Sequence, residues 1–281
     1  GSEMCIRDRV LSINLNDKYQ KENFSRKLVE KFEITKFYST NSDLKNIFIF
    51  FNILKKYSNT RSSTFKLHVK TQEDIDSMSN DIIEDFIKNI ENKKIVMSYQ
   101  THTNNVQIID KNTESYTFKD IDGFITDRKD VALFTFYADC LPIFVYDIEN
   151  KVIGVWHSGW PGTYKEIMKS GLETMKKAYN TKTENVIVGL GIGIQQKNYE
   201  VGMDFYDKFT EKFGKDNELI IKSFKLNKET EKYHFDNMEF NRVMALSLGI
   251  KEENIIISGE NTWDEKFYSH RREGKQAGRA T

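Results

Sequence analysis

Hydrophobic residues in the first third of the chain recur with the periods of both helices and strands. Large apolar residues return every four positions across residues 20–33, which predicts an amphipathic helix. The apolar run at 47–54 predicts a buried strand, and the strict alternation over 65–69 predicts a half-buried strand. A capping-box spacing precedes the apolar face of 75–90, which predicts a second helix.

From residue 94 onwards, short apolar segments separated by polar turns are followed by alternating helices and strands. The predicted strands are 95–97, 106–109, 123–126, 131–136, 143–146, 152–156, 186–190 and 255–257. The predicted helices are 164–179, 204–213 and 240–248. This order of elements predicts a mixed α/β fold.

The chain shows no clear boundary between domains. Residues 1–10 begin with Gly-Ser and are interpreted as an added tag, so they are left out of the fold prediction. Pro142 and Pro161 are the only prolines, and no stretch rich in proline or glycine divides the remainder. We therefore expect residues 11–281 to form a single domain.

Charge and hydropathy exclude several classes of protein. The 42 Lys and Arg residues balance the 42 Asp and Glu residues, which argues against a general nucleic-acid-binding protein. The longest apolar stretch is far shorter than the roughly 20 residues that cross a bilayer. Charges near the start also do not fit a signal peptide. These features predict a cytoplasmic protein that acts on neither membranes nor nucleic acids.

Three residues that can bind a metal stand at the ends of predicted strands: His102, Cys140 and His157. Two imidazoles and one thiolate suit Zn²⁺, and three protein ligands leave a fourth position for water or substrate. The three residues are too widely spaced for a zinc finger, so only tertiary folding could assemble such a site. The same residues also permit a second interpretation, in which Cys140 is a nucleophile and a histidine is its base. Cys5 is the only other cysteine, which excludes a disulfide scaffold.

Two further segments could bind an anion. Residues 158–163 run from a strand into a helix, with Pro161 at the predicted first helical position, so backbone N–H groups at Gly162 and Thr163 could hold phosphate. Ordinary helix capping explains that pattern equally well. The adjacent arginines before Glu273 could clamp an oxyanion, although such pairs are usually solvated. Glycines over 189–193 suggest a backbone close to a ligand or simply tight turns, and they lack dinucleotide-binding spacing.

The ordered motifs of residues 65–281 resemble the bacterial laccase-domain (polyphenol oxidase) family, whose members are regarded as zinc-dependent purine nucleoside phosphorylases and are also named peptidoglycan editing factors. The matching segments share their order with the family and are Gln100-Thr101-His102, Ala138-Asp139-Cys140, His157-Ser158-Gly159-Trp160, Tyr199-Glu200-Val201-Gly202, Asn241-Arg242, 267–272 and Gly278-Arg279. The resemblance implies a single three-layer α/β/α domain with a mixed sheet. It also implies that His102, Cys140 and His157 hold the metal.

The resemblance further implies phosphorolysis of adenosine, inosine, guanosine and methylthioadenosine, together with adenosine deamination. In this hypothesis Zn²⁺ activates water for attack on the purine or orients phosphate. Asp139 is a catalytic candidate and, with Glu200, a candidate general acid. The substrate or phosphate candidates are Gln100, Gly162, Thr163, Glu200, Arg272 and Arg279. Pro161 stands where the family usually has arginine, and Arg272 or Arg279 could replace that cation.

Several alternatives remain open at this point. The same three ligands could hold copper in a polyphenol oxidase, although a multicopper oxidase needs more than the five histidines present. A hydrolase that edits muropeptides and an interaction protein impaired in catalysis by Pro161 are further possibilities. The preferred nucleoside, and whether the protein is a monomer or a dimer, are not decided by the sequence.

Overall fold

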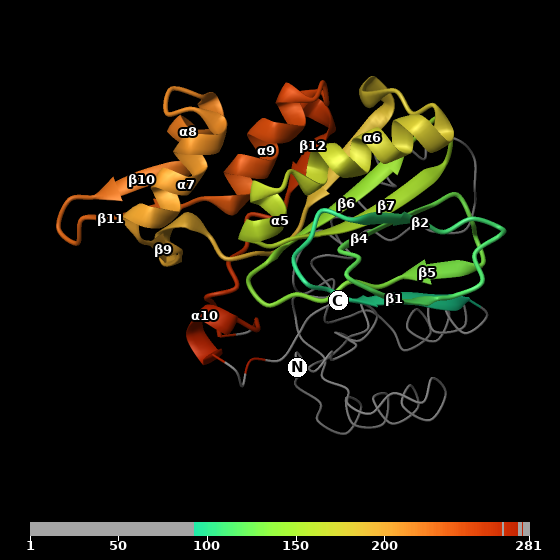
Figure 1. The fold of residues 1–281 in the computed structure, drawn as a ribbon, viewed down its shortest axis with the longest axis horizontal. Coiled ribbons are helices and arrows are strands. Elements are labelled where there is room, and N and C mark those ends of the chain that lie inside the picture. Colours follow the sequence, from blue (N-terminus) through green and yellow to red (C-terminus); the bar gives the residue numbers. More distant parts are fainter. Residues whose placement is uncertain (1–92, 266, 275–276, 278–281) are drawn as a thin grey trace, which may run out of the picture.

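The computed structural model describes residues 93–265, 267–274 and 277 (Figure 1). The elements predicted over 20–33, 47–54, 65–69 and 75–90 lie outside these residues. Within the described part, strands and helices follow one another in the order expected of a mixed α/β fold. That prediction is therefore confirmed.

The centre of the described part is a six-stranded mixed sheet in the order β12-β8-β6-β7-β4-β2. Its inner strands are antiparallel, whereas the edge pairs β12 with β8 and β2 with β4 are parallel. The four inner strands β8, β6, β7 and β4 are almost fully buried, as a sheet covered on both faces requires. Their bounds are β2 Val106–Ile108, β4 Gly123–Thr126, β6 Leu141–Asp147, β7 Val152–Ser158, β8 Val186–Leu190 and β12 Ile255–Ile257.

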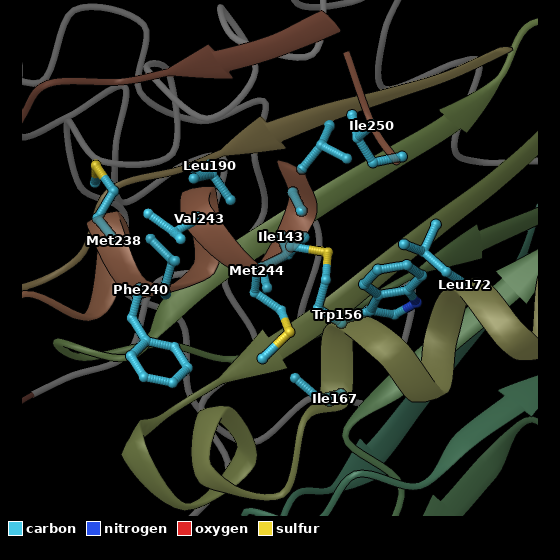
Figure 2. Packing of buried hydrophobic residues seen from close by; sticks show 14 of the residues in the cluster. Ile143, Trp156, Ile167, Leu172, Leu190, Met238, Phe240, Val243, Met244 and Ile250 are labelled. Carbon is cyan, nitrogen blue, oxygen red and sulfur yellow. The ribbon is translucent and has the colours of Figure 1, made fainter. Parts of the chain in front are cut away.

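Helices cover one face of this sheet (Figure 1). They are α5 (Trp160–Tyr164), α6 (Ile167–Tyr179) and α9 (Asn237–Ser247). Figure 2 shows side chains of α6 and α9 packed with Trp156 and Ile143 of the sheet in the main hydrophobic core. A Cβ atom at Gly171 would lie 2.3 Å from the Trp156 ring, so glycine lets α6 approach the sheet closely.

A small parallel sheet covers the opposite face of the central sheet. Its order is β3-β1-β5, and the strands span Thr117–Lys119, Lys94–Tyr99 and Val131–Leu133. Val96, Val131 and Leu133 pack against Phe124 and Phe144 of the central sheet in a second apolar cluster. The central sheet is thereby packed against an apolar cluster on each face.

The later part of the chain adds a third, antiparallel sheet in the order β10-β11-β9. Packed aromatic rings join this sheet to α7, including Phe205, Phe209, Phe224 and Phe235. The remaining elements are β9 Glu200–Val201, α7 Met203–Phe213, α8 Glu218–Ser223, β10 Phe224–Asn227, β11 Lys232–Phe235 and α10 His270–Glu273.

One predicted helix differs from the structure. The pattern predicts a single helix over 164–179, but two helices meet at Glu166, whose left-handed backbone (φ 63°) interrupts the helical geometry. Because α5 already begins at Trp160, Pro161 is the second residue of that helix instead of the first. Among the helices that the structure describes, none is long and apolar enough to span a membrane.

Candidate metal centre

The side chains of His102, Cys140 and His157 meet at one end of the central sheet. Their ligand atoms all lie within 4.8 Å of one another. The Cys140 Sγ atom is 3.5 Å from the His102 Nε2 atom, and the two imidazole rings meet edge to face with centroids 4.8 Å apart. In the part of the chain that the structure describes, this is the one group of three or more His, Cys, Asp or Glu residues placed to hold a metal ion.

The pairing of the central strands explains why these distant residues meet. In the β6–β7 hairpin, Pro142 lies opposite His157 and Leu141 lies opposite Ser158. Cys140 immediately precedes β6, so the open end of the hairpin places it beside His157. His102 comes from the loop that connects β1 to β2 and reaches the same end of the sheet.

Gly159 is the position where the ligands come closest to the backbone. A Cβ atom at this residue would lie 2.5 Å from His102 Cδ2 and 2.8 Å from Cys140 Sγ, far inside normal contact. Its backbone φ of −70° would suit any residue. Glycine is therefore required here because of space, since a methyl group would fill the centre of the cluster.

The ligands perturb one another's ionisation. Burial alone would raise the pKa of the Cys140 thiol, but the neighbouring His157 and His102 lower that pKa to about 6. Burial alone would lower the pKa of His157, but Cys140 and Asp122 raise it to about 9. In the absence of a metal, Cys140 and His157 thus favour a thiolate beside an imidazolium, and the thiolate is the form that ligates metals.

Asp122 is part of this site, although the sequence analysis did not single it out. Its carboxylate is buried and accepts a hydrogen bond of 2.7 Å from His157 Nδ1. The His157 backbone N–H also donates to the Asp122 carbonyl at 2.7 Å, because β4 and β7 pair antiparallel. The one signal in the sequence is an acidic residue directly before a predicted strand, which is also common in ordinary turns.

Asp139 lies next to Cys140 in the chain, and its carboxylate points to the C-terminal segment. It accepts hydrogen bonds of 2.6 Å from Thr262 Oγ1 and 2.6 Å from the Arg271 backbone N–H. Asp139 is not a member of the candidate ligand group. Its two hydrogen bonds nevertheless join the segment before Cys140 to residues that follow more than a hundred positions later in the chain.

The structure gives the predicted substrate residues Gln100 and Thr163 protein partners. The Gln100 amide exchanges two hydrogen bonds with the backbone of Phe136. The Thr163 N–H donates to the Gly159 carbonyl within α5, and its hydroxyl joins a buried polar network with Ser158, Asn237 and Asn241. Gly162 packs against the His157 and Thr103 carbonyls, since an added Cβ would lie 3.3 Å from each.

The remaining predicted anion and acid residues are distributed over the C-terminal half. The Glu200 carboxylate bonds to Lys232 and Thr230, and the Lys232 ammonium lowers the pKa of Glu200. The Arg272 guanidinium donates to the carbonyls of a surrounding loop, which are those of Thr262, Trp263, Asp264 and Phe267. Arg279 lies outside the described residues.

Arg271 has a different environment from Arg272. Its guanidinium lies 5.1 Å from the centre of the Tyr199 ring, and it donates one hydrogen bond of 2.8 Å to the Glu200 carbonyl. Burial raises the pKa of the Tyr199 phenol, and nearby Cys140 and Asp139 raise it further. Tyr199 is therefore close both to the thiol and to Arg271. From the sequence, the two adjacent arginines could not be told apart.

The donor set fits a single zinc ion. Tetrahedral Zn²⁺ takes thiolate sulfur at about 2.3 Å and imidazole nitrogen at about 2.0–2.1 Å, which separates two such donors by about 3.5 Å. The distance between Cys140 Sγ and His102 Nε2 in the structure is 3.5 Å. Three protein donors leave one tetrahedral position for a substrate or water, the arrangement typical of catalytic zinc sites.

Comparisons with known proteins identify the family to which this chain belongs. The sequence model of the family described as "Multi-copper polyphenol oxidoreductase laccase" matches residues 55–281, more than half of the chain. A protein of Bacteroides thetaiotaomicron named purine nucleoside phosphorylase is 31% identical over 197 residues, covering 66% of this chain and 71% of the relative. A prokaryotic protein named adenosine deaminase RL5 is 28% identical over 194 residues, covering 66% of this chain and 72% of the relative.

Solved structures share the fold. YlmD from Geobacillus stearothermophilus superposes with a TM-score of 0.63 at 23% identity, covering 70% of this chain and 75% of that chain. Bacillus licheniformis YfiH superposes with a TM-score of 0.60 at 24% identity, covering 76% of this chain and 81% of that chain. The sequence match together with this fold shows that the chain belongs to the laccase-domain family of polyphenol oxidoreductases.

Proposed function

We propose that this protein is a zinc-dependent purine nucleoside phosphorylase that also deaminates adenosine. Its substrates would be phosphate and adenosine, inosine, guanosine or methylthioadenosine. The observation that carries the proposal is the meeting of His102, Cys140 and His157 within 4.8 Å. Relatives named purine nucleoside phosphorylase and adenosine deaminase supply the reaction class.

The chain would contribute the metal site and its surroundings. Cys140, His102 and His157 would hold Zn²⁺, which when bound supplies a Lewis acid that polarises an oxygen of substrate or phosphate. Phosphorolysis breaks the bond between ribose C1′ and the base nitrogen and forms a bond from C1′ to phosphate oxygen. The base leaves with a proton, and the products are the free base and the sugar 1-phosphate, which is ribose 1-phosphate or, from methylthioadenosine, methylthioribose 1-phosphate.

The proton and the phosphate need protein groups beside the metal. Asp139 remains the candidate proton donor because it adjoins Cys140 and its two hydrogen-bond partners are uncharged groups, whereas the Glu200 carboxylate is ion-paired with Lys232. For phosphate we propose Arg271, because Arg272 already donates to loop carbonyls. Arginine suits this role since its planar fork of N–H donors matches phosphate oxygens. It would replace the cation that is missing at Pro161.

The description of the matching family favours copper as a second candidate metal. A copper site and a zinc site could use the same donors, and divalent copper binds more tightly in general. A multicopper oxidase needs several copper centres, however, and the described residues form a single candidate group. Elemental analysis of protein purified without added copper, paired with a phenol oxidation assay, distinguishes these two metals.

The test of the proposed activity is a chromatographic assay of adenosine with and without phosphate. We expect adenine and ribose 1-phosphate only when phosphate is present, and inosine in either case. The Cys140→Ala variant is the matched control and should form none of these products. The proposal fails if the zinc-loaded wild-type protein converts none of the four nucleosides, or if Cys140→Ala converts them at the wild-type rate.

A further inference from the structure

Asp122 is a fully buried carboxylate that accepts hydrogen bonds from the His157 imidazole and from the backbone of His102. Its relative exposure is 0%, and it directly precedes β4. Its Oδ1 atom accepts from His157 Nδ1 at 2.7 Å and from the His102 backbone N–H at 3.1 Å. One oxygen atom of the protein is therefore bonded to both candidate histidine ligands.

The second oxygen of Asp122 holds the rest of the His102 loop. Oδ2 accepts from the Thr101 N–H at 3.3 Å, the Thr103 N–H at 2.8 Å and the Thr103 hydroxyl at 2.8 Å. Three successive backbone N–H groups, from 101 to 103, thus point at one carboxylate. Such a concave set of N–H groups is a typical anion-binding arrangement of the backbone.

The backbone of His102 explains why this loop needs the carboxylate. Its φ is 60°, in the left-handed region that costs a residue with a side chain roughly 1–2 kcal/mol. In this conformation the three N–H groups point at the buried Asp122 carboxylate. Water could take the place of that carboxylate only if the site opened. The hydrogen bonds to Asp122 therefore offset the strain and fix the position of the His102 imidazole.

For His157, the same carboxylate selects the nitrogen that faces the cluster. A hydrogen bond donated by Nδ1 places the proton on that atom and leaves the Nε2 lone pair free. Metal-binding histidines commonly donate their second N–H group to a carboxylate, which fixes the tautomer and the ring orientation. Asp122 is the carboxylate that accepts this hydrogen bond from His157.

We propose that Asp122 is the positioning residue of the metal centre, holding both imidazole ligands in place through one buried carboxylate. This inference rests on the metal-binding role in the proposed function. All five partners of Asp122 are N–H or O–H donors, so an amide at this position would turn its NH₂ group toward other donors. Aspartate is therefore required by its charge and its acceptor-only chemistry, not by its size alone.

The test compares Asp122→Asn with Asp120→Asn. Asp120 is a matched control because its side chain accepts from Thr101 Oγ1 on the same loop, whereas the described contacts give it no hydrogen bond to His102 or His157. Zinc affinity, measured by competition with a chromophoric chelator, should fall roughly 10- to 100-fold in Asp122→Asn. The affinity of Asp120→Asn should stay within about twofold of wild type, which is small beside that loss.

A second readout separates positioning from simple loss of stability. In the metal-free wild-type protein, ¹⁵N NMR of the His157 ring in a neutral state should show the proton on Nδ1, and Asp122→Asn should shift it toward Nε2. A folded Asp122→Asn protein with wild-type zinc affinity and an unchanged tautomer would overturn the inference. If Asp122→Asn does not fold, an Nε2-protonated His157 in the wild type would overturn it as well.

The same experiment keeps this inference distinct from the proposed function. A wild-type protein that binds no zinc contradicts the proposed function, whatever Asp122 does. A wild-type protein that binds zinc while Asp122→Asn binds it equally well contradicts only the role of Asp122.

The Thr103→Val variant is a milder probe, because it removes only one of the donors to Asp122, the Thr103 hydroxyl. It should weaken zinc binding by less than Asp122→Asn does. An equal or larger loss would contradict the proposal that the Asp122 carboxylate positions the ligands.

Discussion

The two sides of Cys140 are built differently. On the imidazole side, His102 and His157 are held by one buried carboxylate, Asp122, and by strand pairing within the central sheet. On the C-terminal side, Asp139 reaches across to Thr262 and Arg271 through two side-chain hydrogen bonds. The first side is fixed by the register of the sheet, and the second by contacts to a distant segment.

This difference separates two functions of the site. Metal affinity should depend on the imidazole side, because its geometry is part of the folded sheet. Phosphate affinity should depend on the C-terminal side, where Arg271 lies over Tyr199. Changes on one side should therefore leave the property of the other side largely intact.

The largest expected effect is that of Gly159→Ala on the imidazole side. The added methyl group would lie 2.5 Å from His102 Cδ2 and 2.8 Å from Cys140 Sγ, so one ligand must move. We expect zinc affinity to fall at least about 100-fold, the upper range for disturbed metal surroundings. Chelator competition measures this, and a wild-type affinity would show that the ligands do not meet at Gly159.

Arg272→Ala should have the next largest effect, on stability alone. The guanidinium satisfies several carbonyl groups of the C-terminal loop, so truncation leaves them without a donor. Hydrogen bonds to charged groups contribute roughly 1.5–3 kcal/mol, and we expect a loss of about 2 kcal/mol in urea unfolding. Zinc affinity of the folded variant should not change; a large loss of metal binding would contradict the separation of the two sides.

Arg271→Ala is the matched partner of that variant and should act on phosphate. We expect the KM for phosphate to rise about tenfold, which corresponds to about 1.4 kcal/mol. The free energy of unfolding should change little. Among the described contacts, the Arg271 guanidinium donates a single hydrogen bond, to the Glu200 carbonyl. Arg271→Lys should restore part of the affinity through its charge. An unchanged KM in Arg271→Ala would remove Arg271 from the phosphate site.

Apart from the loss of turnover expected of the proposed proton donor, Asp139→Asn should have a smaller effect on the stability of the same side. An amide can still accept from Thr262, but its NH₂ group would face the Arg271 N–H. One lost hydrogen bond contributes about 1 kcal/mol. We expect faster hydrogen exchange over 262–274 with unchanged exchange over 101–103. Equal acceleration in both segments would show that the two sides are coupled.

The smallest change is a pH effect on the metal-free protein. Because the pKa of Cys140 is lowered to about 6, most of the thiol is ionised at neutral pH. The rate of alkylation by iodoacetamide should therefore be half-maximal near pH 6 and level above it. An unperturbed cysteine would give a midpoint near 8.5, and that midpoint here would contradict the pairing of Cys140 with the imidazoles.

Sequence patterns predicted the parts of the fold that depend on local periodicity. The hydrophobic pattern predicts the strands β4, β8 and β12 with their observed bounds. The elements α8, β10 and β11 were not predicted, because charged and exposed residues hide their apolar positions. Glu166 divides a predicted helix through a left-handed backbone, which no hydrophobic period can show.

Site residues can be predicted from the sequence when their side-chain chemistry identifies them. They cannot be predicted when only their position in the folded structure does. Two imidazoles and a thiol are rare enough to stand out in the sequence. Asp122 could not be found, because its role depends on which strand pairs with β7. The contrast between Arg271 and Arg272 was also hidden, since adjacent residues point in different directions and the sequence does not record which one meets Tyr199.

The most direct test of the account is the zinc stoichiometry of the wild-type protein and of Cys140→Ala, measured by native mass spectrometry after chelation and reloading. We expect one zinc ion per wild-type chain and none retained by Cys140→Ala. Phosphate-dependent release of hypoxanthine from inosine should return only when zinc is bound. A wild-type chain that retains no zinc, or a Cys140→Ala chain that retains one, would contradict the central claim.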